Sequence, residues 1–452
     1  MRLVIMFIIC FFMNTLSYGQ SLYFPPLTGS TWETISPTSL GWNVNNIDPL
    51  YALLDSSHTR AFIVLKDGKI ALEKYFGTFT KDSLWYWASA GKTMTSVLVG
   101  IAQSERFLSL SDTTSKWLGK GWTSAPRAKE DRITVRHQLT MTTGLDDDVP
   151  DKDCTFSSCL VYKADAGTRW AYHNAPYTLL DSVMQSSTGM SLSQFYLTRV
   201  RNKTGMNGLY LRSGDYNNVL FTTPRSMARF GLLILNRGAW GSTVVLNDTA
   251  YFNAMINTSQ NINPSYGYLW WLNGKAYHML PSTQFVFPGY LTPPAPKDMI
   301  AALGKNGQIL NVVPSLGLVF IRMGDAPDNS LVPTTLNNQI WERLARVIAP
   351  STSAISQTSD RYPDDFVLSQ NYPNPFNPTT IIKYSLPKVE HVTLKVFDVL
   401  GREVATLVDQ VQEAGFHQSL FSTQEHSLAS GVYFYRLSVG SYTETKQMLV
   451  IK

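Results

Sequence analysis

The chain of 452 residues is 44% hydrophobic and 16% charged, which is enough apolar material for a large core and for more than one domain. Its formal net charge of +5 is small for this length, and its Lys and Arg residues form no block. The composition therefore indicates a globular protein and gives no electrostatic reason to expect a nucleic acid or an anionic membrane surface as a partner.

The first residues are typical of an export signal. Arg2 precedes an apolar run over residues 3–13, and Ser17-Tyr18-Gly19 places small residues where a signal peptidase reads the chain. The run is too short to cross about 30 Å of hydrocarbon comfortably, and no later stretch is long and apolar enough to span a membrane. We predict a signal peptide over residues 1–19 and a soluble mature chain without a membrane span.

The cysteines suggest a disulfide without requiring it. Cys10 lies in the segment that is removed, which leaves Cys154 and Cys159. Export to an oxidising compartment favours a short-loop disulfide, and two free thiols in a surface loop are an equally good interpretation. With no nearby pair of histidines they make a poor zinc site, and we expect no metal and no cofactor.

Strand patterns at both ends of the main segment enclose a helical middle. Two β-rich runs, 61–66 and 69–75, flank Asp67-Gly68, a pair that favours a type I′ hairpin turn. Apolar residues follow helical spacing after Ser89, the region 133–257 is largely helical in pattern, and strand character returns over 309–322 before a closing helix. This order predicts an α+β domain over residues 20–350, with an antiparallel sheet and a helical subdomain.

A second, smaller domain follows. Residues 351–365 are rich in Ser, Thr, Asp and Pro, which is linker composition. Beyond them, Val392, Leu394 and Val396 alternate with polar residues, which predicts a small all-β, sandwich-like domain over residues 366–452. It contains no plausible catalytic cluster.

Ser89-Ala90-Gly91-Lys92 is the first candidate for chemistry. Ser89 and Lys92 are spaced i and i+3, so on a helix they share a face and the amine can reach the hydroxyl. A lysine can take the serine proton when burial lowers its pKa toward neutrality, and a helix start offers N–H groups to an oxyanion. The alternative is an ordinary N-cap serine, and Ser385-Leu386-Pro387-Lys388 shows that the spacing also occurs by chance.

Two further segments could complete a site. In Tyr172-His173-Asn174, directly before an apolar helical stretch, Tyr172 offers a phenol as a proton shuttle and Asn174 an amide as a clamp. Lys305-Asn306-Gly307, followed by Gln308 and a strand, offers a cation for a substrate carboxylate and an open glycine edge. Lys203-Thr204-Gly205 competes with it, but Gly205 there is better explained as a helix C-cap.

The order of these segments resembles that of the serine β-lactamase and penicillin-binding-protein superfamily, above all its class C-like branch of esterases, D-aminopeptidases and amide-dimer hydrolases. The resemblance covers roughly residues 45–348. It is carried by Trp87-Ala88-Ser89-Ala90-Gly91-Lys92-Thr93, by residues 133–145, by Tyr172-His173-Asn174, by Met227-Ala228-Arg229-Phe230-Gly231 and by Tyr266-Gly267-Tyr268-Leu269-Trp270-Trp271.

This resemblance implies a β-lactamase/transpeptidase-like fold and a role for each matching residue. It makes Ser89 the nucleophile, Lys92 its activating partner and Tyr172 a general acid/base. Asn174 would orient the substrate, and the backbone N–H groups of Ser89 and Gln308 would form the oxyanion hole.

In the third motif, the resemblance gives Lys305 the basic position, with Gly307 at the substrate. His173 stands where the family often has a small residue, and Asn306 replaces the usual hydroxyl residue. These two departures argue against recognition of a carboxylate-bearing β-lactam more than against acyl transfer.

Several other polar and aromatic residues have structural interpretations. We expect His137 to pack or cap at a helix start, Asp146-Asp147-Asp148 to form a solvated loop, and Trp270 and Trp271 to lie in the core.

The tail, residues 366–452, resembles a type IX secretion C-terminal sorting domain of type A. The segments that carry the resemblance are 371–378, Val399-Leu400-Gly401-Arg402-Glu403-Val404 and Gly431-Val432-Tyr433. It implies that the type IX secretion machinery takes the protein through the outer membrane after the signal peptide has delivered it to the periplasm. The alternative is a small β-sandwich that binds carbohydrate or a partner.

The sequence thus predicts a secreted or cell-surface serine hydrolase that cleaves an ester or amide through an acyl-enzyme on Ser89. A class C-like β-lactamase or a D-alanyl peptide hydrolase is the alternative within that class. The alternative of another class is a surface binding protein that has kept the fold and lost turnover.

Overall fold

The computed structural model describes residues 22–213, 216–326, 330–349, 365–372, 374–423, 426 and 428–451. The chain divides into two compact units, residues 1–352 and 353–452. The expected signal peptide, residues 1–19, and all but the last residue of the expected linker, 351–365, lie outside the described residues. Those boundaries stay predictions.

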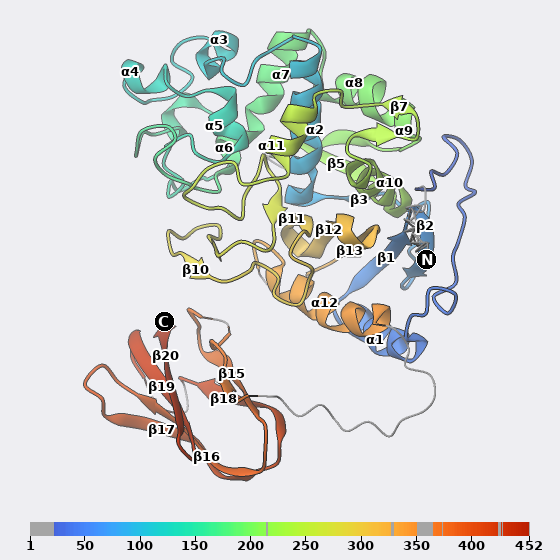
Figure 1. Cartoon of the computed structure of the whole chain (residues 1–452). Coiled ribbons are helices and arrows are strands. Elements are labelled where there is room, and N and C mark those ends of the chain that lie inside the picture. Colours follow the sequence, from blue (N-terminus) through green and yellow to red (C-terminus); the bar gives the residue numbers. More distant parts are fainter. Residues whose placement is uncertain are drawn as a thin grey trace, which may run out of the picture. The chain divides into compact units, whose positions relative to one another are not determined.

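A six-stranded antiparallel sheet forms the centre of the first unit, in the order β2-β1-β13-β12-β11-β8 (Figure 1). The strands are β1 (Thr59–Lys66), β2 (Lys69–Tyr75), β8 (Trp271–Leu272), β11 (Ile300–Gly304), β12 (Gln308–Val313) and β13 (Leu318–Gly324). In the β1–β2 turn both Asp67 (φ 49°) and Gly68 (φ 86°) have positive φ, as a type I′ turn requires. The sheet joins the two ends of the unit, which confirms the α+β expectation.

Helices cover both faces of this sheet. Gly231 of α10 (Pro224–Leu235) lies so close to β13 that a Cβ on it would come 2.4 Å from Val319 Cγ1. Trp341 of α12 (Thr334–Ile348) packs on the next residue of β13, Phe320, with ring centroids 5.5 Å apart. Neighbouring residues of a strand point to opposite faces, so α10 and α12 lie on opposite faces of the sheet. Beside α12 runs α1 (Ile47–Ser56).

Between β2 and β8 the chain forms the helical subdomain, with α2 at its centre (Figure 1). Its helices are α2 (Lys92–Ser104), α3 (Thr114–Leu118), α4 (Arg127–Glu130), α5 (Val135–Leu139), α6 (Asn174–Thr178), α7 (Leu180–Thr188), α8 (Leu192–Tyr196), α9 (Asn202–Thr204) and α11 (Thr249–Met255). Gly205, with φ 65°, is the C-cap of α9, as its sequence context predicted.

The middle of the chain also contains small sheets that the helical pattern did not predict. One is the three-stranded sheet β3-β5-β4, and two are short hairpins. The strands are β3 (Trp85–Tyr86), β4 (Leu209–Ser213), β5 (Tyr216–Thr222), β6 (Ala239–Trp240), β7 (Thr243–Val244), β9 (Tyr277–His278) and β10 (Phe287–Pro288). Most are two residues long, too short to leave a periodic signal in the sequence.

The second unit is all β, as predicted. Two sheets, β14-β15-β18 and β17-β16-β19-β20, enclose one apolar core that includes Val392, Leu394 and Val396. The strands are β14 (Val367–Leu368), β15 (Thr379–Leu386), β16 (Glu390–Phe397), β17 (Glu403–Gln412), β18 (Gly415–Ser422), β19 (Gly431–Val439) and β20 (Tyr442–Val450).

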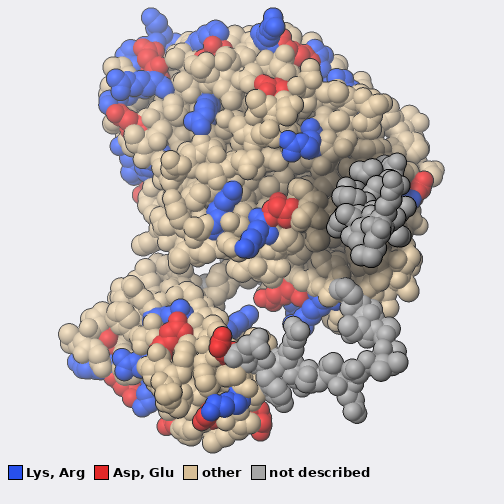
Figure 2. Space-filling view, in the orientation of Figure 1, with Lys and Arg blue, Asp and Glu red and all other residues tan. Residues whose placement is uncertain are grey.

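Charges of both signs are interspersed over the face shown in Figure 2. At α3 and α4, Lys116 pairs with Asp112, and Arg127 pairs with Glu130 and Asp131. Among the described residues, none of the helices combines the length and the apolar character that a bilayer span needs.

Candidate active site

Ser89 lies in the 3-10 turn η2 (Ala88–Gly91), which follows β3 and runs directly into α2. Trp87 anchors this turn, because its N–H donates to the carbonyl of Leu220 at 2.9 Å and its indole Nε1 donates to Thr222 Oγ1 at 2.8 Å. Ala88 has φ 46°, in the left-handed region that a residue with a Cβ rarely adopts. A sharp and firmly held turn thus presents Ser89 at the start of a helix.

Lys92, the first residue of α2, contacts Ser89 directly. Its Nζ donates to Ser89 Oγ at 2.8 Å, and the lysine is only 5% exposed. The ammonium position lies 5.1 Å from the ring centroid of Tyr172 and 4.4 Å from that of Tyr177. Burial lowers the pKa of Lys92 to about 7, against the attraction of Asp153, so the amine is available as a proton acceptor near neutral pH.

Tyr172 contacts both members of this pair. Its hydroxyl interacts with Ser89, and this hydrogen bond lowers the pKa of Tyr172 less than burial raises it. The ring stacks on Trp271 of β8, with centroids 5.8 Å apart and planes at 17°. Tyr172 is therefore a protonated phenol at neutral pH, and Trp170 and Tyr266 also pack against its ring. Trp270 and Trp271 are both buried, as expected for core residues.

Asn174, the first residue of α6, is held by an acid that sequence reasoning missed. Its Nδ2 donates to Asp153 Oδ1 at 2.8 Å. Asp153 directly precedes Cys154, which forms a disulfide with Cys159. Nothing in the local sequence marks Asp153 as part of a site.

The end of β11 runs beside the amide of Ser89. A Cβ on Gly304 would lie 3.1 Å from Ser89 N and 2.8 Å from Ala90 N. Gln308, expected to share the oxyanion hole with Ser89, pairs with Gly304 from β12, one strand further into the sheet. Its side-chain amide donates to the carbonyls of Asn306 and Gly324, which are contacts that support the hairpin.

The remaining third-motif residues form the β11–β12 turn. Lys305 is exposed, and Asn306 Nδ2 donates to the Tyr86 hydroxyl at 2.6 Å. Gly307 has φ 73°, and a Cβ on it would lie 2.3 Å from Arg322. The Arg322 guanidinium is fully buried and donates to the carbonyls of Asn306 and Gly307. Close packing on Arg322 is thus one clear reason for glycine at position 307.

Of the residues for which the sequence favoured a structural role, His137 behaves as expected and Asp147 does not. His137 completes a capping box with Thr134 at the start of α5, as expected. The expectation of a solvated loop over 146–148 is wrong for Asp147, which is 7% exposed and pairs with Arg169 at 2.5 Å. Pairing with a cation 22 residues away is what permits its burial. Within the described residues, no group of His, Cys, Asp and Glu is arranged to hold a metal ion.

An antiparallel sheet joined to a helical subdomain is the β-lactamase/transpeptidase-like fold. The chain belongs to the Beta-lactamase family, whose model matches residues 56–328. Residues 370–452 match the model of the Secretion system C-terminal sorting domain. The protein is accordingly exported by type IX secretion to the cell surface or the extracellular space.

Solved structures share the fold at low identity. A Bacillus anthracis protein provisionally named a 6-aminohexanoate-dimer hydrolase matches with a TM-score of 0.55 and 18% identity, over 70% of this chain and 87% of that one. A family VIII carboxylesterase matches with a TM-score of 0.53 and 14% identity, over 70% and 99%. A penicillin-binding protein homologue from Caulobacter crescentus gives 0.53 and 12%, over the same shares. Among curated proteins, none matches the chain.

Proposed function

We propose that the first unit is a serine hydrolase that cleaves an ester or amide through an acyl-enzyme on Ser89. The observation that carries this proposal is the 2.8 Å contact between Lys92 Nζ and Ser89 Oγ, made by an amine whose burial lowers its pKa to about 7. A serine needs a base to become a nucleophile, and a lysine serves as that base only where it is neutral. This pair meets both requirements.

The reaction follows from these positions. Ser89 Oγ attacks the substrate carbonyl carbon while its proton passes to Lys92 Nζ. The oxyanion that forms is stabilised by the N–H of Ser89 at the positive end of α2. When the tetrahedral intermediate collapses, the leaving group takes a proton from the Tyr172 hydroxyl, and the Lys92 ammonium returns a proton to Tyr172. Water then attacks the acyl-enzyme carbonyl and gives a proton to the neutral Lys92 Nζ. When this second intermediate collapses, the acid product leaves and the Lys92 ammonium returns the proton to Ser89 Oγ, which restores the free enzyme.

The role of Tyr172 as an acid follows from its pKa, which burial raises. A phenol that stays protonated at neutral pH can donate a proton and cannot first accept one. Lys92 faces both Tyr172 and Ser89, so one amine can take the proton from the serine and restore it to the phenol.

An ester or amide substrate is consistent with acyl transfer, and the names of two fold neighbours, a carboxylesterase and an amide-dimer hydrolase, support it. A β-lactamase or D-alanyl peptide hydrolase is the alternative within the class. Lys305, the lysine expected to bind a substrate carboxylate, is exposed in the β11–β12 turn. This position favours a substrate without a carboxylate over a β-lactam.

A hydrolysis screen of aryl esters, D-amino-acid amides and a chromogenic cephalosporin tests the proposal. Wild type is expected to turn over at least one of them, and Ser89→Ala to reduce that rate to background. Ser385→Ala, which removes the serine of the second Ser-x-x-Lys match, is the control and should leave it unchanged. Activity that survives Ser89→Ala would overturn the mechanism, and a folded wild type inert toward every class would favour a binding protein.

A further inference from the structure

Asp153 fixes the orientation of the Asn174 amide. The bond from Asn174 Nδ2 to Asp153 Oδ1 is 2.8 Å long. An ionised carboxylate only accepts hydrogen bonds, so the amide nitrogen must point to Asp153 and the amide oxygen must point away. That oxygen is buried and has no hydrogen-bond partner among the described residues. A buried acceptor without a partner costs free energy, which a hydrogen bond from a substrate N–H or O–H would recover.

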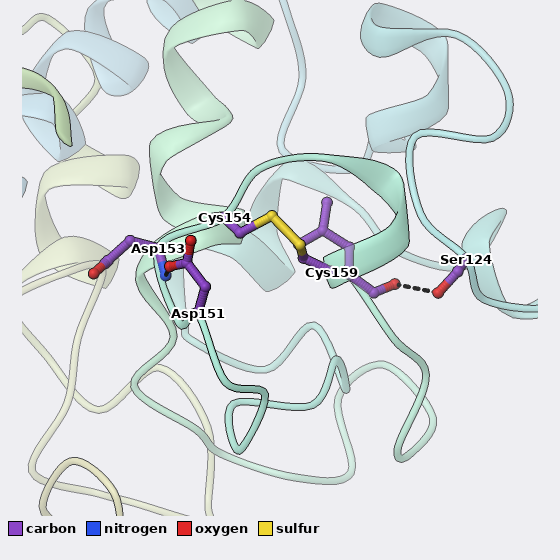
Figure 3. Close-up of a disulfide and its surroundings, with 6 residues drawn as sticks. Ser124, Asp151, Asp153, Cys154 and Cys159 are labelled. Atoms are coloured by element: carbon purple, nitrogen blue, oxygen red, sulfur yellow. Dashed lines mark hydrogen bonds between the residues drawn. A yellow bond between two sulfur atoms is a disulfide. The ribbon is translucent and has the colours of Figure 1, made fainter. Parts of the chain in front are cut away.

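The segment that follows Asp153 is held by a disulfide and by Ser124 (Figure 3). Before the disulfide, the N–H of Asp153 donates to Asp151 Oδ1 at 3.0 Å. Cys154 and Cys159 close the loop, and the carbonyl of the next residue, Leu160, accepts from Ser124 Oγ at 3.3 Å and from Ser124 N at 3.1 Å. The carboxylate of Asp153 is thus attached to a short, cross-linked segment.

The charge of Asp153 also reaches the lysine. Its attraction raises the pKa of Lys92, against the larger effect of burial. The Ser89 hydroxyl and the rings of Tyr172 and Tyr177, which also face Lys92, are neutral, and Asp153 is the charged group that shifts the Lys92 pKa.

Two earlier acids of this region form ion pairs elsewhere. Asp146 pairs with Lys163 at 2.8 Å and Asp147 pairs with Arg169 at 2.5 Å. Asp153 therefore differs from them in acting toward Asn174 and Lys92.

We propose that Asp153 is a positioning residue of this site, which locks the amide of Asn174 in one orientation and places a negative charge within reach of the buried Lys92 amine. The proposal rests on the proposed function, because it assigns Asp153 a role in the same reaction. It also gives the Cys154–Cys159 disulfide a purpose, since the cross-link holds the segment from which Asp153 acts.

The test compares pH profiles of kcat/KM, and of the rate at which a fluorophosphonate probe labels Ser89, in the full-length protein. Asp153→Asn removes the charge that raises the Lys92 pKa, so we expect the acid limb of the profile to move to lower pH by roughly half a unit or more. It also allows the Asn174 amide to rotate by about 180°. The plateau should fall roughly five- to tenfold, as for one lost hydrogen bond. Asp153→Ala should show the same shift and a larger loss.

Two further variants complete the design. Asp153→Glu keeps the charge and should titrate as wild type does. Asp148→Asn removes an exposed charge from the same loop and should change neither profile. Folding of each variant is checked by circular dichroism. If Asp153→Asn and Asp153→Ala titrate and label as wild type, the inference is overturned while the proposed function stands. If wild-type Ser89 does not label at all, the proposed function itself has failed.

Discussion

Gly304 of β11 approaches the amide of Ser89 so closely that a Cβ in its place would lie 3.1 Å from Ser89 N and 2.4 Å from the carbonyl oxygen of Trp87. Because these neighbours are backbone atoms of the anchored turn η2, they cannot move aside without displacing the nucleophile. The contact ties the edge of the sheet to the start of the helix that carries Ser89 and Lys92.

Gly304→Ala is therefore expected to lower the free energy of unfolding by about 1–3 kcal/mol, as overpacking does. Hydrolysis should fall at least tenfold, because Ser89 must shift. Urea denaturation and the rate of Ser89 labelling measure the two effects. Gly91→Ala is the matched variant for stability, since its Cβ would meet Leu220 Cβ at 3.4 Å, an ordinary contact. Equal stability of the two variants would contradict this account of Gly304.

The second prediction concerns the pH dependence of turnover. Lys92 must be neutral to accept the Ser89 proton, and its pKa is lowered to about 7. The value of kcat/KM should therefore fall with decreasing pH below about 7 and level off above it. Lys92→Arg keeps a cation that does not lose its proton, and it should reduce the rate by roughly 10²–10⁴-fold across the range. A Lys92→Arg variant with the wild-type profile would rule out Lys92 as the base.

A third prediction follows from the cost of burying Lys92. In the unfolded chain this lysine is protonated up to its usual pKa of 10.5, whereas in the folded protein it loses its proton at about 7. Folding thus works against the charged form, and Lys92→Met should raise the free energy of unfolding by about 2–4 kcal/mol near pH 7 while it abolishes turnover. The gain should shrink as pH rises from 7 toward 10.5, because the unfolded lysine then loses its proton too.

Denaturation of Lys92→Met and wild type at several pH values measures this effect. Thr93→Val, a change at the buried neighbouring position, serves as a control that leaves the lysine in place. A stability gain that does not change with pH would mean that packing, and not the lysine charge, is responsible.

The ease of prediction from sequence differed between local and long-range features. Two features depend only on residues close in sequence: the contact between Ser89 and Lys92, and the Asp67-Gly68 turn. The structure contains both, as predicted. The place of Gly304 beside Ser89 depends on the packing of residues more than 200 positions apart, which no local pattern records. Asp147 was misjudged for the same kind of reason, since only its distant partner Arg169 explains its burial.

Asp153 shows a further limit. A single acid in a loop without periodicity gives no signal of its own, and its bond to Asn174 spans 21 residues that include a disulfide. The sequence left the state of Cys154 and Cys159 open, because spacing alone permits both a disulfide and two thiols.

The disulfide supplies a fourth prediction. It closes a loop between residues only five positions apart, so its effect on the unfolded chain is modest. The double variant Cys154→Ser/Cys159→Ser should lose about 2 kcal/mol of stability, measured by urea denaturation. Dithiothreitol should destabilise the wild type by a similar amount and leave the double variant unchanged. A destabilisation of the double variant by the reductant would contradict this, since residues 22–452 contain no other cysteine.

The central claim is that Ser89 forms a covalent bond to the acyl group and that Lys92 activates it. Mass spectrometry of wild type, Ser89→Ala and Lys92→Met after reaction with a fluorophosphonate tests this most directly. We predict a single adduct that maps to the peptide carrying Ser89 in wild type, none in Ser89→Ala, and labelling slowed by roughly 10²-fold or more in Lys92→Met. An adduct on another residue, or a Lys92→Met variant that labels as fast as wild type, would contradict the account.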